Sequence, residues 1–198
     1  MAGPLGMEEQ WIVDSKAGDP AAFGQLVAAH QKQLFGFLYS YTGRRDVADE
    51  LTQEAFLKAW GGMKGFRAES RFQTWLFQIG LNLLRSWGRR ETVRRWREVA
   101  LVFSRPEDER PRSVADLAPD ERADADPHRN AEGRERGAAL RVALARLPPK
   151  EKAVFLLRHE QGMALADIAA TLGIAEGTVK AHLFHAVQKL RRTMEEGT

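Results

Sequence analysis

The 198-residue chain contains no cysteine, which excludes disulfides, zinc sites built on thiolates and thiol catalysis. It also lacks any stretch approaching the roughly 18 consecutive apolar residues that a membrane-spanning helix needs. Residues 1–10 have neither the basic start nor the apolar run of a signal peptide. We therefore expect a protein that is not inserted in a membrane and that works in the cytoplasm.

The net charge of the chain is only +3, but the charged residues are unevenly distributed. Six arginines crowd the segment 85–97, with Glu91 and Glu98 as the acids nearby. The segment 106–126 is instead rich in aspartate and glutamate. Separated blocks of opposite charge are typical of a chain that meets more than one kind of surface.

Hydrophobic periodicity predicts helices and no strand. Apolar residues recur at spacings of three and four over 23–41 and 72–87, as on one face of a helix. Prolines and acids dominate 98–133, where too little apolar surface remains to offset the chain entropy. The sequence therefore predicts an all-α protein, with two small helical domains over 11–97 and 134–195 joined by a flexible acidic linker.

Three helix starts are predicted from local signals. Asp19 before Pro20 has the form of an N-cap with proline at the first helical position. Asp46 is expected to cap the next helix. Ser70, followed three residues later by Gln73, has the form of a capping box.

A helix-turn-helix is predicted between Leu165 and Arg192. Residues 165–172 form a short amphipathic helix, Gly173 permits the backbone reversal, and 176–192 form a longer helix. The alternative is an ordinary helical hairpin with a solvated polar face. The spacing of Gly-Ile to Gly-Thr-Val-Lys favours DNA binding.

The second helix of this motif carries a polar stripe that is expected to face the major groove. Basic side chains beside the stripe are expected to hold phosphates. The residues expected at DNA are Thr178, Lys180, Ala181, His182, His185, Lys189 and Arg192. The two histidines could also be metal ligands, but no further ligand is evident near them, so DNA contact is favoured.

Two motif blocks, in the same order, resemble the extracytoplasmic-function (ECF) sigma factors. Residues 49–60 (Asp-Glu-Leu-Thr-Gln-Glu-Ala-Phe-Leu-Lys-Ala-Trp) and 66–76 resemble the family's second conserved region. Residues 154–158 and 177–180, with Ile168-Ala169 between them, look like its fourth region. The resemblance covers nearly the whole chain except the linker.

The resemblance implies a dissociable subunit of bacterial RNA polymerase, with no catalytic site and no cofactor. The first domain would bind the polymerase clamp helices and open the minus-ten promoter element. The second would bind the minus-thirty-five element and the polymerase flap, and an anti-sigma protein is implied as a further partner. The implied clamp-binding side chains, whose acids suit a basic partner, are Asp49, Glu50, Gln53 and Glu54.

Aromatic and basic residues alternate where the family melts DNA. Aromatic rings stack on unpaired bases and arginines neutralise phosphates, which helps to capture a flipped base. The resemblance assigns minus-ten contacts to Phe66, Arg67, Arg71, Trp75, Asn82, Arg85, Arg89 and Arg90. Phe72 and Trp75 also fall on an apolar stripe, so packing in the core is the alternative for both.

The chain departs from the family pattern at several positions. Ala175 stands where a serine usually caps the recognition helix, and His182 and His185 stand where arginines are common. Because arginine contacts guanine bidentately and histidine does so less readily, we expect an atypical minus-thirty-five sequence. Ser86 replaces a common aspartate, which weakens the transfer of roles around Asn82.

Three further interpretations remain open from the sequence. The acids over 107–126 could mimic nucleic acid in a basic polymerase channel, or the segment could be a solubilising tether. The stretch Gly-Thr-Val-Lys-Ala-His-Leu also resembles the LuxR-type helix-turn-helix, which would make the protein a classical regulator with a sensor or dimerisation domain. A helical nuclease would need clustered acids for metal, and the acids here are scattered.

Overall fold

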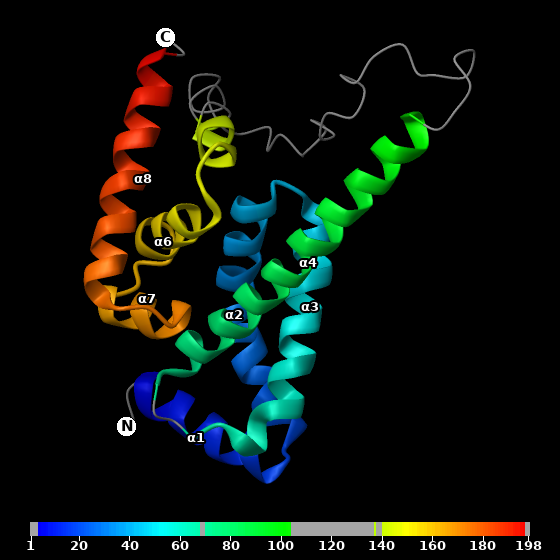
Figure 1. The fold of residues 1–198 in the computed structure, drawn as a ribbon. Coiled ribbons are helices and arrows are strands. Elements are labelled where there is room, and N and C mark those ends of the chain that lie inside the picture. Colours follow the sequence, from blue (N-terminus) through cyan, green and yellow to red (C-terminus); the bar gives the residue numbers. More distant parts are fainter. Residues whose placement is uncertain (1–3, 68–69, 104–136, 138–139, 197–198) are drawn as a thin grey trace.

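The computed structural model describes residues 4–67, 70–103, 137 and 140–196, and these contain helices and no strand. The predicted all-α class is therefore confirmed. Residues 140–145 are helical, although they carry no label. The labelled elements, in chain order, are α1 (Pro4–Ala17), α2 (Pro20–Thr42), α3 (Arg45–Gly62), the 3-10 turn η1 (Met63–Gly65), α4 (Phe72–Phe103), α6 (Pro149–His159), α7 (Leu165–Leu172) and α8 (Glu176–Glu196) (Figure 1).

The predicted start of α2 is confirmed. The side-chain oxygen of Asp19 accepts a hydrogen bond from the backbone N–H of Ala21 at 2.8 Å, and Pro20 opens the helix. The helix ends where Gly43 adopts φ 69°, in the left-handed region that glycine enters at little cost. Local signals thus fix both ends of this 23-residue helix.

The predicted cap of α3 is wrong. Arg44 is the N-cap residue, and Asp46 lies inside the first turn. Its carboxylate accepts a hydrogen bond from the Arg44 guanidinium at 2.6 Å, which lowers the pKa of Asp46. A negative charge in this turn still suits the positive end of the helix.

The predicted capping box before α4 is also wrong. The helix begins at Phe72, and the carbonyl of Arg71 accepts the backbone N–H of Trp75 at 3.2 Å. The side chain of Gln73 donates to Gln33 on α2 at 3.1 Å. A contact between helices therefore takes the side chain that the sequence pattern assigned to a cap.

Helices α2, α3 and α4 pack around a common core. The rings of Phe37 on α2 and Phe77 on α4 lie 5.4 Å apart, and both are fully buried. Gly80 permits this close crossing, because a Cβ there would lie 3.0 Å from Cδ1 of Leu34. Helix α1, which the sequence analysis did not predict, packs on α2 and η1.

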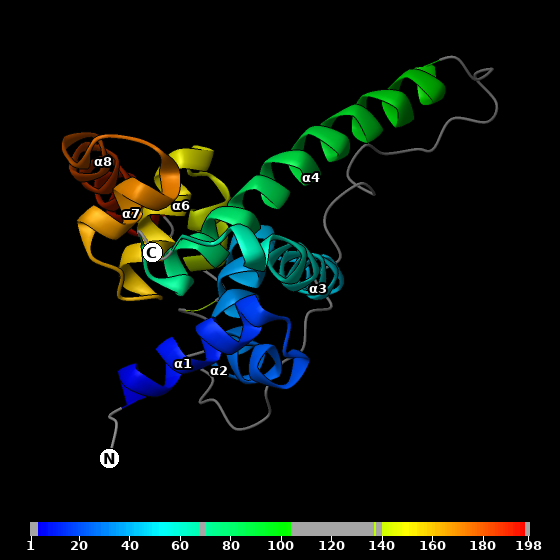
Figure 2. The same cartoon turned by 90° about the horizontal axis from the view of Figure 1, so that it is seen from below.

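Helix α4 is longer than the predicted first domain. It continues to Phe103, past the expected boundary at residue 97, and its second half extends beyond the neighbouring helices (Figures 1 and 2). Residues 98–103 of the predicted linker therefore belong to a helix. The rest of that linker, residues 104–133, lies outside the described residues.

Helices α6, α7 and α8 form the C-terminal group. Gly173 separates α7 from α8 with φ 68°, as the predicted helix-turn-helix requires. The group packs directly on the N-terminal helices, with α6 against α2 and α7 against the first half of α4 (Figures 1 and 2). The two groups share one continuous buried core. No helix in the described part of the chain is long and apolar enough to span a membrane.

Candidate nucleic-acid interface

The start of α8 lacks a side-chain cap. The carbonyl of Ala175 accepts the backbone N–H groups of Thr178 and Val179 at 2.9 and 3.1 Å, so the residue at the cap position has no side-chain acceptor. Glu176 lies in the first turn and pairs with Lys180 at 2.9 Å. That carboxylate interacts favourably with the helix dipole and partly compensates for the missing cap.

One side of α8 is sealed in the core and the opposite side is exposed. Val179, Ala186 and Leu190 are buried. Five of the residues expected at DNA are exposed, namely Thr178, Lys180, Ala181, His185 and Arg192. His182 is only half-exposed, because it lies nearer the core side of the helix.

Lys189 does not stand on this exposed face as the sequence analysis expected. Its Nζ donates hydrogen bonds to both carboxylate oxygens of Glu151 on α6, at 2.8 and 2.9 Å. The Glu151 side chain is only 10% exposed. The lysine therefore joins α8 to α6, and its charge is paired with that of Glu151.

Phe184 and Gln188 belong to the exposed face, and the sequence analysis missed both. Phe184 is 60% exposed, and its ring lies 5.7 Å from the ring of His185. The signal was present in the helical phase: residues 181, 184 and 188 recur at spacings of three and four, opposite the core residues.

The aromatic residues of the expected minus-ten site form a packed cluster. The Phe66 ring lies 4.9 Å from Trp75 and 6.0 Å from Phe72, and Phe66 is only 5% exposed. Gly62 makes room, because a Cβ there would lie 3.2 Å from Cζ2 of Trp75. Phe72 is fully buried and Trp75 is half-buried, so both rings pack in the core, which was the alternative given for them in the sequence analysis.

A buried histidine lies beneath this cluster. The His30 ring lies 5.3 Å from Phe72, and neither ring nitrogen makes a hydrogen bond. Its Nε2 is 3.5 Å from a carboxylate oxygen of Glu8, on α1. His30 on α2 therefore lies between Glu8 on α1 and Phe72 at the start of α4. The sequence pattern did not indicate this connection.

The polar residues of the expected minus-ten site remain exposed along α4. Asn82, Arg85 and Arg89 follow one another at spacings of three and four and therefore share a face. Arg85 donates to the Asn82 side chain at 3.0 Å, and Arg89 to Ser86 at 3.1 Å. Arg90 is exposed beside them, and Arg67 and Arg71 are exposed near the two ends of the preceding loop.

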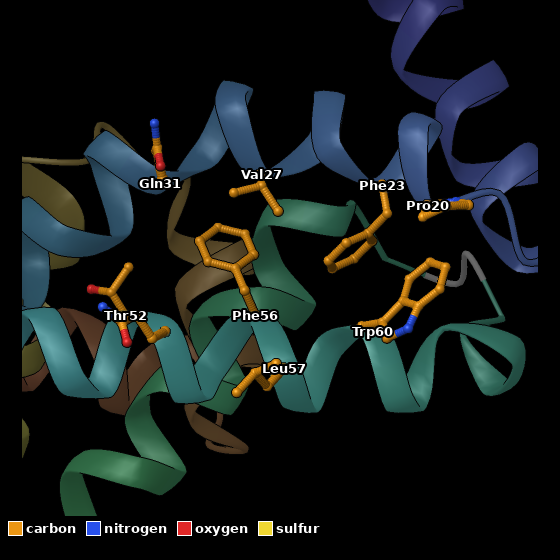
Figure 3. A pocket seen from close by; sticks show the side chains of 9 residues that line it. Pro20, Phe23, Val27, Gln31, Thr52, Phe56, Leu57 and Trp60 are labelled. Carbon is orange, nitrogen blue, oxygen red and sulfur yellow. The ribbon is translucent and has the colours of Figure 1, made fainter.

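An apolar groove of about 550 Å³ runs between α2 and α3 (Figure 3). Its apolar walls include Phe23, Val27, Phe56, Leu57 and Trp60. Leu57, which lines the groove, is 72% exposed. Figure 3 shows Phe23 and Trp60 at one end of the groove, where their rings lie 5.0 Å apart.

The residues expected to bind polymerase are on α3, and one of the four lines this groove. Asp49 and Glu50 are exposed on α3, and Gln53 lines the groove itself. Glu54 is half-exposed and pairs with Lys58 at 3.5 Å. The groove therefore has mainly apolar walls, and two exposed acids precede it along α3.

Comparison with known proteins yields two family matches. Residues 26–96 match Sigma-70 region 2, and residues 137–190 match Sigma-70, region 4. The chain is 32% identical to the ECF RNA polymerase sigma factor SigM of Mycobacterium tuberculosis, over 90% of this chain and 80% of that protein. It is 28% identical to the ECF RNA polymerase sigma-E factor of Haemophilus influenzae, over 96% of both.

Two solved structures are similar to the chain. CnrH, in complex with the cytosolic domain of CnrY, covers 97% of this chain with a TM-score of 0.69, at 22% identity over 99% of that chain. The sigma factor RpoE of Bartonella quintana, in complex with the anti-sigma factor NepR, covers 87% of this chain and 96% of its own, with a TM-score of 0.62 at 26% identity. The first likeness shows the fold. Because region 2 and region 4 both match in the order expected, and because the identity to SigM extends over most of both chains, the chain belongs to the ECF RNA polymerase sigma factors.

Proposed function

We propose that this chain joins core RNA polymerase and directs it to promoters, with α8 on the minus-thirty-five duplex and α4 on the minus-ten element. The observation that carries the proposal is the exposed side of α8. Its core side is sealed by three buried residues, while a face of polar, basic and aromatic side chains is left to solvent. In this role the chain is an initiation factor, and the chemistry of transcription belongs to the polymerase.

The minus-thirty-five contacts divide by chemistry. Phe184 suits the methyl group of thymine, and His185 suits a hydrogen bond to a base edge. Thr178 and Ala181 bring the helix close to the groove, because both side chains are small. Arg192 would bind a phosphate of the duplex. Such a contact fixes the position of α8 along the DNA and does not depend on the base sequence.

The minus-ten contacts are assigned to the polar face of α4. Asn82, Arg85 and Arg89 are exposed at helical spacing, so the three side chains follow one strand of nucleic acid. Phe66 and Trp75 hold the ends of the preceding loop by packing together. Their contribution to melting is then to shape the loop that carries Arg67 and Arg71.

The groove between α2 and α3 is assigned to the polymerase clamp helices. An apolar groove of this kind accepts the apolar face of an amphipathic helix. Asp49 and Glu50 would pair with basic residues on the flank of that helix and favour fast association. The polymerase flap would engage the C-terminal helices, over 134–195.

An anti-sigma protein is proposed as a further partner. The solved structure of RpoE from Bartonella quintana holds the anti-sigma factor NepR. A protein of this kind would bind free sigma and keep it from polymerase. The acids over 107–126, which lie outside the described residues, retain the two roles that the sequence suggests, as a nucleic-acid mimic or as a tether.

Start mapping after overexpression of the chain, followed by transcription with purified core polymerase on the mapped promoters, tests the proposal. We expect the mapped starts to share a pair of upstream elements, and transcription to depend on the chain. The double variant Asp49→Lys, Glu50→Lys should lose polymerase binding and keep duplex binding. Starts without shared elements, or transcripts that do not depend on the chain, would overturn the proposal.

A further inference from the structure

Helix α1 packs on the turn that leads into the loop 66–71, the loop that carries Arg67 and Arg71. This turn is η1, which ends one residue before the loop (Figure 1). The backbone N–H of Phe66 donates to the carbonyl oxygen of Met63 at 3.1 Å, and both residues are buried. The start of the loop is therefore fixed on a turn that α1 supports.

A second connection runs from α1 to the end of the same loop. Phe72, the first residue of α4, is buried, and its ring lies 5.3 Å from the ring of His30 on α2. The Nε2 atom of His30 lies 3.5 Å from a carboxylate oxygen of Glu8 on α1. The Phe72 ring also meets the Phe66 ring edge-on at 6.0 Å. Helix α1 therefore supports the residues at both ends of the loop.

His30 is a polar side chain in apolar surroundings. It is 7% exposed, and neither of its ring nitrogens makes a hydrogen bond. A buried polar group without a partner destabilises the folded state. Hydrogen bonds of the N–H···O type are about 2.7–3.2 Å long, so a small movement of the Glu8 side chain, which is 30% exposed, would give His30 an acceptor. A bond of this kind is strong because the acceptor is charged.

Helix α1 does not depend on Glu8 for its attachment to the protein. Trp11 and Ile12 are half-buried and pack against the hydrophobic core, and Ser15 is buried. Glu8 lies about two helical turns before Ser15, near the start of the helix. Removal of the Glu8 charge should therefore leave α1 in place and change only what surrounds His30.

We propose that Glu8 and His30 are positioning residues for minus-ten recognition. Glu8 holds His30, His30 holds the Phe72 ring, and Phe72 fixes the end of the loop 66–71, which presents its two arginines to the DNA. The inference rests on the proposed function, because the position of this loop matters only if the loop binds the minus-ten element. Neither residue contacts DNA itself, and the Glu8 carboxylate would repel a phosphate. The match to Sigma-70 region 2 begins at residue 26 and so does not include α1.

The expected effect on affinity is modest and local. Loss of one hydrogen bond changes an equilibrium constant by about 2- to 12-fold. If the loop 66–71 competent for binding is populated less, the affinity for minus-ten DNA falls by the same factor as that population. Binding of α8 to the minus-thirty-five duplex should be unchanged, because α8 does not contact this loop or α1 in the described contacts between elements.

Two variants and their combination test whether Glu8 acts through His30. Glu8→Gln removes the charge and nearly keeps the shape of the side chain. His30→Phe keeps a ring against Phe72 and removes both ring nitrogens. In the His30→Phe background, Glu8→Gln should have no further effect, because the two residues share one interaction. Glu9→Gln is the matched control, since Glu9 is exposed on the same helix.

Two measurements on the full chain read the effect. Fluorescence anisotropy, with the chain bound to core polymerase, gives the affinity for a labelled single strand that carries the mapped minus-ten element and for the minus-thirty-five duplex. Hydrogen exchange of the free chain reports the order of the loop 66–71 without DNA. We expect Glu8→Gln to weaken single-strand binding by about 2- to 12-fold and to speed exchange over this loop. Duplex binding and exchange over α8 should match the parent, and Glu9→Gln should match it throughout.

Three results would overturn the proposal. One is a Glu8→Gln variant that leaves either the exchange of the loop or the affinity for the single strand as in the parent. Another is an equal loss of affinity for the duplex, which would show a general change of the fold. The third is an effect of Glu8→Gln that persists in the His30→Phe background. If His30→Phe proves to be unfolded by circular dichroism, the first two results decide. Failure of the proposed function is distinct, since the loop would still exchange faster while the parent bound no minus-ten strand.

Discussion

Lys189 on α8 and Glu151 on α6 form a bidentate ion pair, with Nζ at 2.8 and 2.9 Å from the two carboxylate oxygens. The Lys189 side chain remains 43% exposed, while the carboxylate is nearly covered. The pair joins the middle of the recognition helix to the helix behind it. Helical phase predicted that Lys189 contacts DNA. The structure shows instead that Lys189 connects α8 to α6 through its ion pair with Glu151.

Lys189→Met should lower the free energy of unfolding by about 1.5–3 kcal/mol, because it leaves the buried Glu151 carboxylate without its charged donor. Urea denaturation measures this change. The matched control is Lys180→Met, since Lys180 pairs with Glu176 at the surface, where such pairs contribute about 0.3–0.5 kcal/mol.

The same two variants separate a packing role from a DNA contact. Loss of a phosphate contact reduces the slope of log K against log salt by about 0.9. We expect that reduction for Lys180→Met, and an unchanged slope for Lys189→Met on the minus-thirty-five duplex. A reduced slope for Lys189→Met would show that Lys189 contacts a phosphate of the duplex.

Phe184→Ala should weaken binding to the minus-thirty-five duplex by about 1–3 kcal/mol, the typical cost of losing recognition of one base pair. Stability should change little, because the ring is largely exposed. Fluorescence anisotropy with a labelled duplex measures the affinity. If Phe184→Ala bound the duplex as tightly as the parent, or lost stability without losing affinity, the ring would be a packing residue and not a base contact.

Phe66→Ala should cost about 3–5 kcal/mol of stability, because it empties a buried site in the aromatic cluster. A ring that served only to stack on bases would lie at the surface and cost little when removed. Thermal and urea unfolding decide between the two. Arg89→Gln is the comparison: it should keep stability and weaken binding to single-stranded minus-ten DNA.

Gly80→Val should destabilise the protein by about 1–3 kcal/mol through overpacking, because even a Cβ at this position meets Leu34 at 3.0 Å. Gly88→Val on the same helix is the control, since nothing lies within 4 Å of a Cβ there. Gly88→Val should change stability little or raise it slightly, because valine forms helices more readily than glycine. Equal losses in the two variants would mean that the close crossing of α4 and α2 does not set the cost.

Short-range signals were sufficient for much of this fold. Asp19 with Pro20, and Gly173 after a short amphipathic helix, each act within a few residues, and both were predicted correctly. The cap at Asp46 was wrong because the helix begins earlier, with Arg44 as the N-cap residue, and the Asp46 carboxylate pairs with Arg44. The capping box at Ser70 was wrong because the sequence does not show which distant group competes for a side chain. Gln73, for example, reaches Gln33, 40 residues away.

The candidate site was less predictable for the same reason. Helical phase alone put Lys189 near the reading face, and Glu151, 38 residues earlier, was invisible to that argument. Phe184 was overlooked because apolar residues were sought on the core side. Helix α6 packs on α2, where the Tyr41 hydroxyl lies 3.5 Å from the carbonyl oxygen of Pro149, whereas a polar linker suggested independent domains. The family resemblance supplied the roles, while the packing had to come from the structure.

The free energy of unfolding should rise between about pH 8 and 10 through Lys152. Burial lowers the pKa of Lys152 from its ordinary value of 10.5 to about 8, so the folded chain holds the neutral amine more readily than the unfolded chain does. Below about pH 8 the lysine is charged in both states, and this group gives no pH dependence. Between about pH 8 and 10 the folded chain releases the proton first, so the free energy of unfolding measured by urea denaturation should rise with pH.

The groups that face Lys152 limit this window. The Nζ of Lys152 lies 5.1 Å from the centre of the Tyr41 ring. Burial raises the pKa of Tyr41, so its ionisation opposes folding at still higher pH, and the charge of Arg85 acts against that shift. Burial also raises the pKa of Glu160, and the charge of Lys152 opposes that shift. Lys152→Met should abolish the rise, while Lys150→Met, at an exposed position of the same helix, should keep it. A rise of equal size in Lys152→Met, or a fall in the free energy of unfolding of the parent between pH 8 and 10, would contradict the assignment of this dependence to Lys152.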